Sequence, residues 1–225
     1  MSFENHFRSL GGDKPGDPTN PMGFTRSTGF TPQPVPNLVR AAMVRVVAGE
    51  RMGRGFMVDA TGHIVTELTL VDEANRIKAS TFDNDVFLAR ITHKDVSRGL
   101  ALIEIPERTP GHLTLGDVGS VDVGDDCLLV AKQSGETTEL GKGIITALRH
   151  INGVAVIQFE APGELGAGGT PILSAQGDVI GICSSRFEKN RDNVGFAVSA
   201  NELKSLLYAE WADFDIDKVF KKIDV

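Results

Sequence analysis

The feature that most constrains the fold is a long series of short apolar segments, bounded by turn residues, between about residues 38 and 199. Short segments rich in Val, Ile, Leu and Phe predict β-strands. The expected strands are Gly55–Val58, His63–Thr66, Ile77–Phe82, Val86–Ile91, Leu100–Ile105, Cys127–Ala131, Gly143–Ala147, Val154–Phe159, Pro171–Leu173, Val179–Cys183 and Val194–Val198. Turn signals such as Asn152-Gly153 separate them, and many short strands at this spacing are typical of a β-barrel or a β-sandwich.

Helical periodicity emerges near the C-terminus, at Asn201–Tyr208. Leu203, Leu206 and Leu207 recur at the spacing that places them on one helix face. We therefore expect an all-β domain, residues 37–209, that ends in a helix.

The last segment, residues 210–225, is expected to be an amphipathic tail. Ile216 and Phe220 recur at helical spacing, and Trp211 precedes them. A helix of about ten residues is marginal alone in water, so this apolar stripe needs a surface to pack on. That surface is either the chain's own barrel or a partner protein, and Trp211, Ile216 and Phe220 are candidate partner-docking residues.

The first segment, residues 1–36, differs from the rest in composition. It holds six of the ten prolines and shows no strand or helix periodicity. Such a segment cannot bury enough apolar surface to order itself. Gly23-Phe24-Thr25 recurs as Gly29-Phe30-Thr31. We expect an arm that is either disordered or ordered by a protein partner, with Phe24 and Phe30 as candidate docking residues.

Charge and the pattern of histidines argue against several classes of partner. The formal net charge is −7, whereas nucleic-acid-binding proteins are usually basic. The histidines form no HxxxH or HxH pair of the kind that binds a metal. We expect no nucleic acid, no metal and no cofactor.

The apolar segments also bear on compartment and cysteine chemistry. No apolar stretch approaches the length of about 18 residues that a transmembrane helix needs. The first residues lack the apolar core of a signal peptide, which predicts a cytoplasmic or other internal compartment. Cys127 and Cys183 form either one long-range disulfide or, as we favour, two buried free thiols.

Six regions, taken in order, resemble motifs of the HtrA/Deg-like branch of the trypsin superfamily. They are Gly53–Thr66, Leu115–Asp125, Gly143–Leu148, Ile157–Ala161, Gly177–Ile182 and Gly195–Val198. The first resembles the family's GSGVIVDxxGYIVTN hairpin, and the last resembles its GFAIP segment. The resemblance implies a trypsin-like double six-stranded β-barrel with a cleft between the barrels. The residues after Tyr208 are too few for the PDZ domain that the family usually carries, so we expect none.

The resemblance also gives a place to each member of a Ser-His-Asp triad. The histidine position is Thr69, the aspartate position is Gly99 and the serine position is Gly168. Acyl transfer needs a nucleophile, a base and a group that orients the base. A threonine and two glycines do not form that set, so we expect no catalytic residue and a non-catalytic pseudoprotease.

The expected function is that of a protein-binding or structural subunit of a larger assembly. The candidate peptide-binding residues are Cys183, Ser184, Ser185 and Arg186, which match the strand edge that pairs with substrate in the family. Strand addition uses main-chain groups and needs no triad. The alternative is a serine-protease-like hydrolase that uses a non-standard nucleophile or is active only in a complex. Thr170 and Ser174 lie near the former nucleophile loop, but no histidine matches either as a base.

Overall fold

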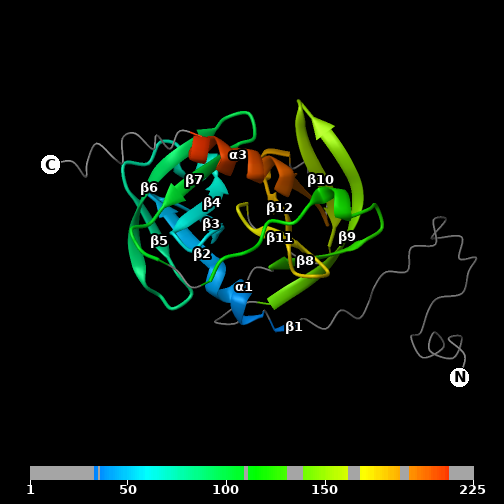
Figure 1. Ribbon diagram of the computed structural model, residues 1–225, viewed down its shortest axis with the longest axis horizontal. Helices are drawn as coiled ribbons and strands as arrows, with labels where there is room; N and C mark the ends of the chain where they lie inside the picture. Colours follow the sequence, from blue (N-terminus) through cyan, green and yellow to red (C-terminus); the bar gives the residue numbers. More distant parts are fainter. Residues whose placement is uncertain are drawn as a thin grey trace, which may run out of the picture. The chain divides into compact units, whose positions relative to one another are not determined.

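The structure is a computed structural model that describes residues 33–34, 36–108, 111–130, 139–161, 168–187 and 193–212 (Figure 1). Its internal contacts divide the chain into residues 1–31 and residues 32–225, and every described residue belongs to the second unit. Phe24 and Phe30 of the predicted arm lie outside the described residues, and so do Ile216 and Phe220 of the predicted tail.

Six antiparallel strands close the first barrel in the order β2-β3-β4-β7-β6-β5. They are β2 (Met43–Ala48), β3 (Arg51–Met57), β4 (His63–Glu67), β5 (Ile77–Ser80), β6 (Val86–Asp95) and β7 (Leu100–Glu104). Successive side chains of a strand point to opposite faces. Val44, Val46 and Ala48 of β2 are therefore all buried, while Arg45 between them is exposed.

The second barrel is built from the next six strands. They are β8 (Asp126–Val130), β9 (Glu139–Ile151), β10 (Val154–Glu160), β11 (Pro171–Ser174), β12 (Val179–Cys183) and β13 (Val194–Ser199). The sheet order is β1-β9-β10-β13-β12-β11-β8, and a further pairing of β8 with β9 closes these six strands. The short β1 (Gln33–Pro34) pairs with the first two residues of β9.

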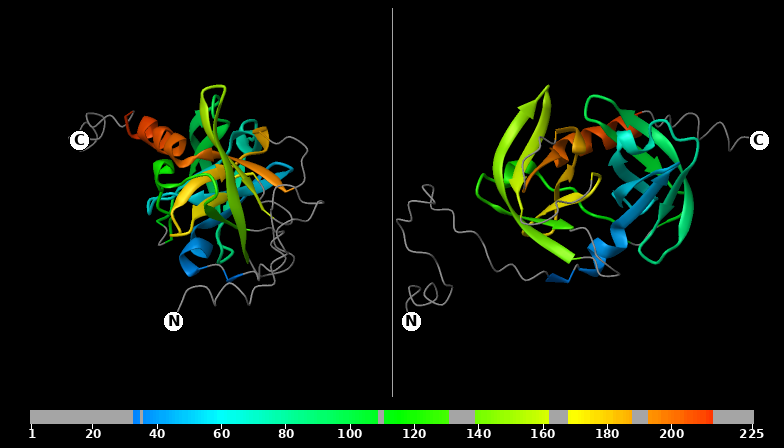
Figure 2. Two further views of the ribbon diagram at one scale, coloured as in Figure 1. Left: turned by 90° about the vertical axis from the view of Figure 1, so that its right-hand side faces the viewer. Right: turned by 180° about the vertical axis from the view of Figure 1, so that it is seen from behind.

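The two barrels stand side by side in Figures 1 and 2. This arrangement confirms the predicted double six-stranded barrel. The predicted Asn-Gly turn between β9 and β10 is also present, because Asn152 and Gly153 both have positive φ, 52° and 82°. Two positive φ values suit the two-residue hairpin turn that this dipeptide favours.

Tertiary pairing lengthens some strands beyond what their own residues indicate. The sequence predicts a strand that ends at Ile91, but β6 continues to Asp95 because Lys94 and Asp95 pair with β7. The strand β2, which pairs with both β3 and β5, was not among the expected strands, although its residues alternate between apolar and polar at Val44, Arg45 and Val46. Backbone hydrogen bonds between strands do not depend on side-chain polarity, so polar residues can extend a strand that a barrel already holds.

Five short or medium helical segments complete the described chain. They are α1 (Asn37–Ala42), α2 (Leu68–Val71), η3 (Val118–Ser120), η4 (Ser185–Phe187) and α3 (Ala200–Ala212). α3 confirms the predicted C-terminal helix and buries Leu203, Leu206 and Leu207. Among the described residues, no helix has the length and apolar composition that a membrane span requires.

α3 also joins the two barrels through one acidic side chain. Glu202 accepts a hydrogen bond from the backbone N–H of Ala155 in the second barrel, at 3.0 Å. It also pairs with Arg98 of the first barrel, and Arg98 in turn pairs with Asp95. Figure 1 shows α3 along the edge at which both barrels meet. The helix therefore helps to set how the two barrels face each other.

The two cysteines are buried free thiols. Cys127 lies in β8, and burial raises the pKa of its thiol to about 12. Cys183 ends β12 and is also buried. The favoured interpretation of two free thiols is confirmed.

Candidate functional site

Two of the three positions assigned to the family's triad, Gly99 and Gly168, lie at contacts between the two barrels, and the third, Thr69, lies in the first barrel. Thr69 belongs to α2, which follows β4 directly. Gly99 lies in the turn between β6 and β7, and its carbonyl accepts the N–H of Leu68 at 2.9 Å. Gly168 comes from the second barrel, shortly before β11.

Gly168 lies against the carboxylate of Glu67, a residue that the sequence analysis did not select. A Cβ atom at residue 168 would overlap Cδ and Oε2 of Glu67 and would lie 3.0 Å from Oε1. Glu67 ends β4, and only 9% of the residue is exposed. An acidic side chain of the first barrel thus fills the space in which the family motif has its serine side chain.

The carboxylate of Glu67 holds a residue of the second barrel. Oε1 accepts the backbone N–H of Ser185 at 2.7 Å. The Ser185 hydroxyl lies 3.0 Å from Oε1 and 3.1 Å from Oε2. Buried carboxylates need hydrogen-bond donors to offset the loss of water. Ser185 supplies two such donors, so this contact ties β4 of one barrel to η4 of the other.

Gly99 is covered by a second contact between the barrels. Its φ is +71°, a conformation that glycine adopts without steric cost. A Cβ atom there would lie 3.2 Å from Cδ of Arg186. The Arg186 guanidinium donates to the carbonyl oxygens of Val96 and Ser97 at 2.7 and 2.8 Å. Arg186 therefore lies across the turn in which the family motif has its aspartate.

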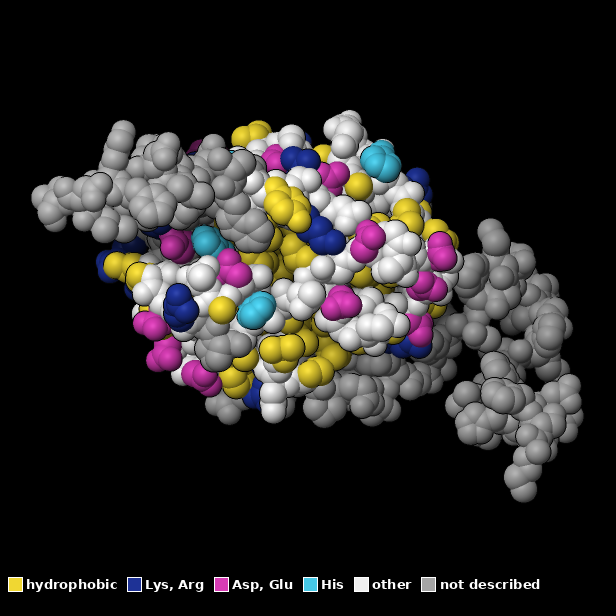
Figure 3. All heavy atoms as spheres, in the orientation of Figure 1, with side chains coloured by type: hydrophobic (Ala, Val, Ile, Leu, Met, Phe, Trp, Pro, Cys, Tyr) yellow, Lys and Arg dark blue, Asp and Glu magenta, His cyan; other side chains and the backbone are white. Residues whose placement is uncertain are grey.

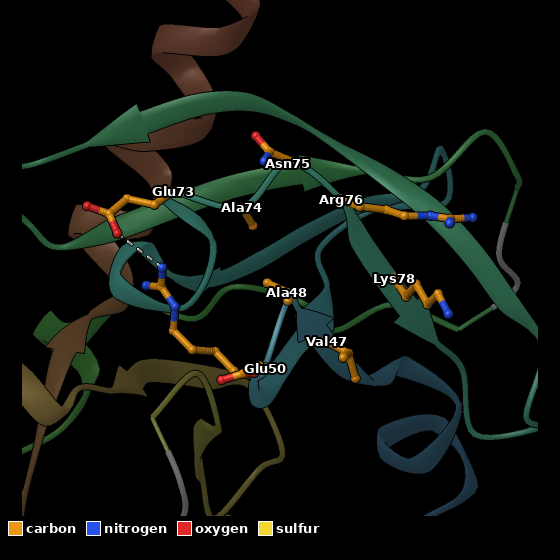
Figure 4. A pocket seen from close by; sticks show the side chains of 10 residues that line it. Val47, Ala48, Glu50, Glu73, Ala74, Asn75, Arg76 and Lys78 are labelled. Carbon is orange, nitrogen blue, oxygen red and sulfur yellow. Dashed lines mark hydrogen bonds and ion pairs between the residues drawn. The ribbon is translucent and has the colours of Figure 1, made fainter.

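Thr69 is exposed, and it contacts Arg51, one of the residues that line a surface pocket of about 600 Å³ in the first barrel. Its carbonyl oxygen accepts a hydrogen bond from Arg51, which also pairs with Glu73 at 3.4 Å (Figure 4). The pocket is lined by Val47, Ala48, Gly49, Glu50, Arg51, Glu73, Ala74, Asn75, Arg76 and Lys78. Exposed ion pairs of this kind contribute little free energy. On the face drawn in Figure 3, acidic and basic side chains lie interspersed among polar ones.

The residues predicted to bind peptide, Cys183–Arg186, all direct their amides into the domain. The N–H groups of Cys183 and Ser184 donate to the carbonyl oxygens of Thr170 and Phe196, at 2.8 and 3.0 Å. That of Ser185 donates to Glu67, and that of Arg186 donates to the Ser184 hydroxyl at 3.3 Å. The strand ends at Cys183, and the chain then turns into η4. A peptide that paired with this segment would have to displace an internal acceptor.

The two hydroxyls considered as relocated nucleophiles are not placed to react. Thr170 is fully buried, and its Oγ1 has no hydrogen-bond partner among the described residues. Ser174 is also buried, and its hydroxyl accepts the N–H of Gln176 at 3.3 Å. Among the described residues, no cluster of three His, Cys, Asp or Glu side chains could hold a metal ion. Trp211 belongs to α3, but its side chain is outside the described part.

One signal in the sequence could have drawn attention to Glu67. It follows Ile64, Val65 and Thr66 in a run where the family motif has asparagine. A carboxylate at the end of an otherwise buried strand needs a partner. The sequence does not show which residue that partner is, because Ser185 lies far along the chain.

Comparison with known proteins supports the family that the motifs suggested. The trypsin-like peptidase domain family matches residues 53–182, which is more than half of the chain. The periplasmic serine endoprotease DegP of Salmonella typhimurium is 31% identical over 167 residues, which cover 69% of this chain and 34% of that protein. The magnetosome formation protease MamE of Paramagnetospirillum magneticum is 30% identical over 174 residues, covering 72% of this chain and 24% of that protein. The chain thus spans about one third or less of these relatives.

A solved structure matches the fold. The HtrA-type protease AlgW with tripeptide superposes with a TM-score of 0.67 and 23% sequence identity. The match covers 76% of this chain and 60% of that chain. At this identity the likeness concerns the double-barrel fold.

Two predictions are wrong in the light of these relatives. The chain was expected to be a non-catalytic pseudoprotease with a degenerate triad, but DegP and MamE are both named as proteases. That prediction rested on Thr69, Gly99 and Gly168 at the triad positions and on the lack of a histidine that matches Thr170 or Ser174. The expected cytoplasmic or other internal compartment is likewise overturned, because DegP is named as periplasmic.

Proposed function

Because the chain belongs to the trypsin-like peptidase domain family and to its HtrA/Deg-like branch, we propose that it acts on polypeptides at the junction between its two barrels. The observation that carries the proposal is the meeting of both barrels at Glu67, Gly168 and Ser185. The same elements of the fold carry the active site in the family motif. Ser185 and Arg186 are exposed there, so a polypeptide can reach the junction from solvent.

The proposed reaction is hydrolysis of peptide bonds, the activity that the names of the relatives state for those proteins. Covalent hydrolysis needs a nucleophile and a base that takes its proton. Gly168 has no side chain and cannot be that nucleophile, so the proposal requires one at another residue. The proposed compartment is outside the cytoplasm, in keeping with the periplasmic relatives.

We also propose that the protein works with protein partners. The support is the composition of its two ends, since Phe24, Phe30, Ile216 and Phe220 are large apolar residues in segments rich in polar ones. Aromatic side chains such as phenylalanine are enriched at protein interfaces. Cys183, Ser184, Ser185 and Arg186 remain the proposed peptide-binding residues.

The test is an assay of the full chain with fluorescein-labelled β-casein, an unfolded polypeptide. Anisotropy measures binding, and release of labelled fragments measures hydrolysis. A fluorophosphonate probe reports a reactive serine, and mass spectrometry of the labelled protein identifies it. Glu73→Ala, a change on the rim of the surface pocket, is the control for nonspecific effects. Binding with fragment release supports the proposal. A folded, pure chain that neither binds nor cleaves β-casein would contradict it.

A further inference from the structure

Glu67 occupies the proposed site in two ways. Its carboxylate fills the space beside Gly168, where the family motif has a reacting side chain. It also accepts the backbone N–H of Ser185, which belongs to the segment predicted to pair with peptide. The side chain is therefore an internal occupant of the proposed site.

The contacts of η4 show how firmly the site is held in this arrangement. Ser185 donates both its N–H and its hydroxyl to Glu67. The next residue, Arg186, reaches back to the carbonyl oxygens of Val96 and Ser97 in the first barrel. Two consecutive residues of the second barrel are thus bound to two separate segments of the first. The backbone N–H groups of Ser185 and Arg186 already donate to acceptors within the domain, so neither can pair with a peptide strand while these bonds hold.

We propose that Glu67 keeps the polypeptide site closed, and that a polypeptide binds by displacing the Glu67 carboxylate from Ser185. The inference rests on the proposed function, because it concerns access to the same site. The incoming acceptor is a backbone carbonyl of the polypeptide, which takes over the Ser185 N–H. The Glu67 carboxylate then turns away from Gly168 towards water, leaving the space beside that glycine open.

The chemistry of the exchange sets the expected effect. A hydrogen bond to a charged group is stronger than one to a neutral carbonyl. The polypeptide must therefore replace a strong internal bond with a weaker one, which lowers its affinity. Removing the carboxylate removes that competition, and we expect Glu67→Ala to bind β-casein about tenfold to a hundredfold more tightly than the wild type.

The experiment measures binding of labelled β-casein by anisotropy for the wild type, Glu67→Ala, Glu67→Gln and Glu73→Ala. Glu67→Gln keeps the size of the side chain and removes its charge, so it should tighten binding less than Glu67→Ala. It also serves where the alanine variant fails to fold. Glu73 is an exposed glutamate of the same barrel, and its replacement should leave affinity unchanged. Thermal unfolding confirms that each variant is folded.

Hydrogen exchange at the Ser185 amide gives a readout that a purely structural role would not produce. The amide should be protected in the wild type, lose protection in Glu67→Ala, and regain it when β-casein is bound. If the wild type binds β-casein and the folded Glu67 variants bind it no more tightly, the inference is overturned and the proposed function stands. Absence of binding by the wild type and by folded Glu67→Ala alike would overturn both.

Discussion

Gly168→Ala adds a single methyl group at the point where the two barrels meet. The new Cβ would overlap Cδ and Oε2 of Glu67, so the carboxylate has to move. Gly168 itself has no positive φ, so alanine fits its backbone. The change therefore tests the packing of Glu67 against residue 168 and leaves backbone strain out of the comparison.

The loss of stability follows from the hydrogen bonds that Glu67 gives up when its carboxylate moves. Its carboxylate accepts the N–H and the hydroxyl of Ser185. Hydrogen bonds to charged groups contribute about 1.5–3 kcal/mol each, and water at the displaced carboxylate returns part of that. We expect Gly168→Ala to lower the free energy of unfolding by about 2–4 kcal/mol, a large share of the stability of a typical domain.

A double-mutant cycle separates this mechanism from others. In the Glu67→Ala background the overlap is gone, so Gly168→Ala should change the free energy of unfolding by less than about 0.5 kcal/mol, or stabilise slightly by restricting the unfolded chain. Urea unfolding of the four proteins gives the coupling energy. Gly119→Ala is the control, because a Cβ there lies 3.4 Å from its nearest neighbour, an ordinary contact. The reasoning is refuted if Gly168→Ala lowers the free energy of unfolding equally in both backgrounds, or does not lower it in the wild-type background.

Three further predictions concern stability and reactivity. Glu202→Ala should lower the free energy of unfolding, measured in urea, by about 1–3 kcal/mol, because it removes one of the two acidic partners of Arg98 and the acceptor of the Ala155 backbone N–H. An unchanged urea midpoint would contradict this. Burial raises the pKa of Asp95, but hydrogen bonds from Ser97 and Arg98 outweigh it and hold the pKa below the usual 3.8. Its contribution to stability is therefore complete above about pH 5 and is lost as the pH falls through the lowered pKa, so Asp95→Asn should flatten the acid limb of a stability-against-pH curve. Cys127, with its pKa raised to about 12, should react with a thiol reagent at pH 8 only after unfolding, and fast labelling of that residue in the folded protein would show the thiol to be accessible.

Much of the fold was encoded locally. Apolar residues at alternate positions and turn dipeptides such as Asn152-Gly153 mark strands and hairpins, because a side chain's burial and a turn's φ values depend on neighbours in the chain. The helix at Asn201–Tyr208 was predictable for the same reason. The end of β6 was not, because its polar residues Lys94 and Asp95 carry no strand signal and are held by pairing with β7. The strand β2 was overlooked, although Val44, Arg45 and Val46 alternate as in a half-buried strand.

The site shows the limit of local reasoning most clearly. The motifs located Thr69, Gly99 and Gly168 in the sequence, and the reasoning built on these positions led to a prediction that the protease-named relatives overturn.

The strand and turn pattern by itself indicated a β-barrel or a β-sandwich, and the resemblance of its motifs to a known family implied the double barrel and the triad positions. Only the tertiary structure decided what occupies that junction: the Glu67 carboxylate beside Gly168, and the chain turning into η4 at Ser185 in place of a peptide-pairing strand. The physical reason is distance along the chain. Glu67 and Ser185 are 118 residues apart, and a buried carboxylate takes whichever donors the packed barrels bring to it.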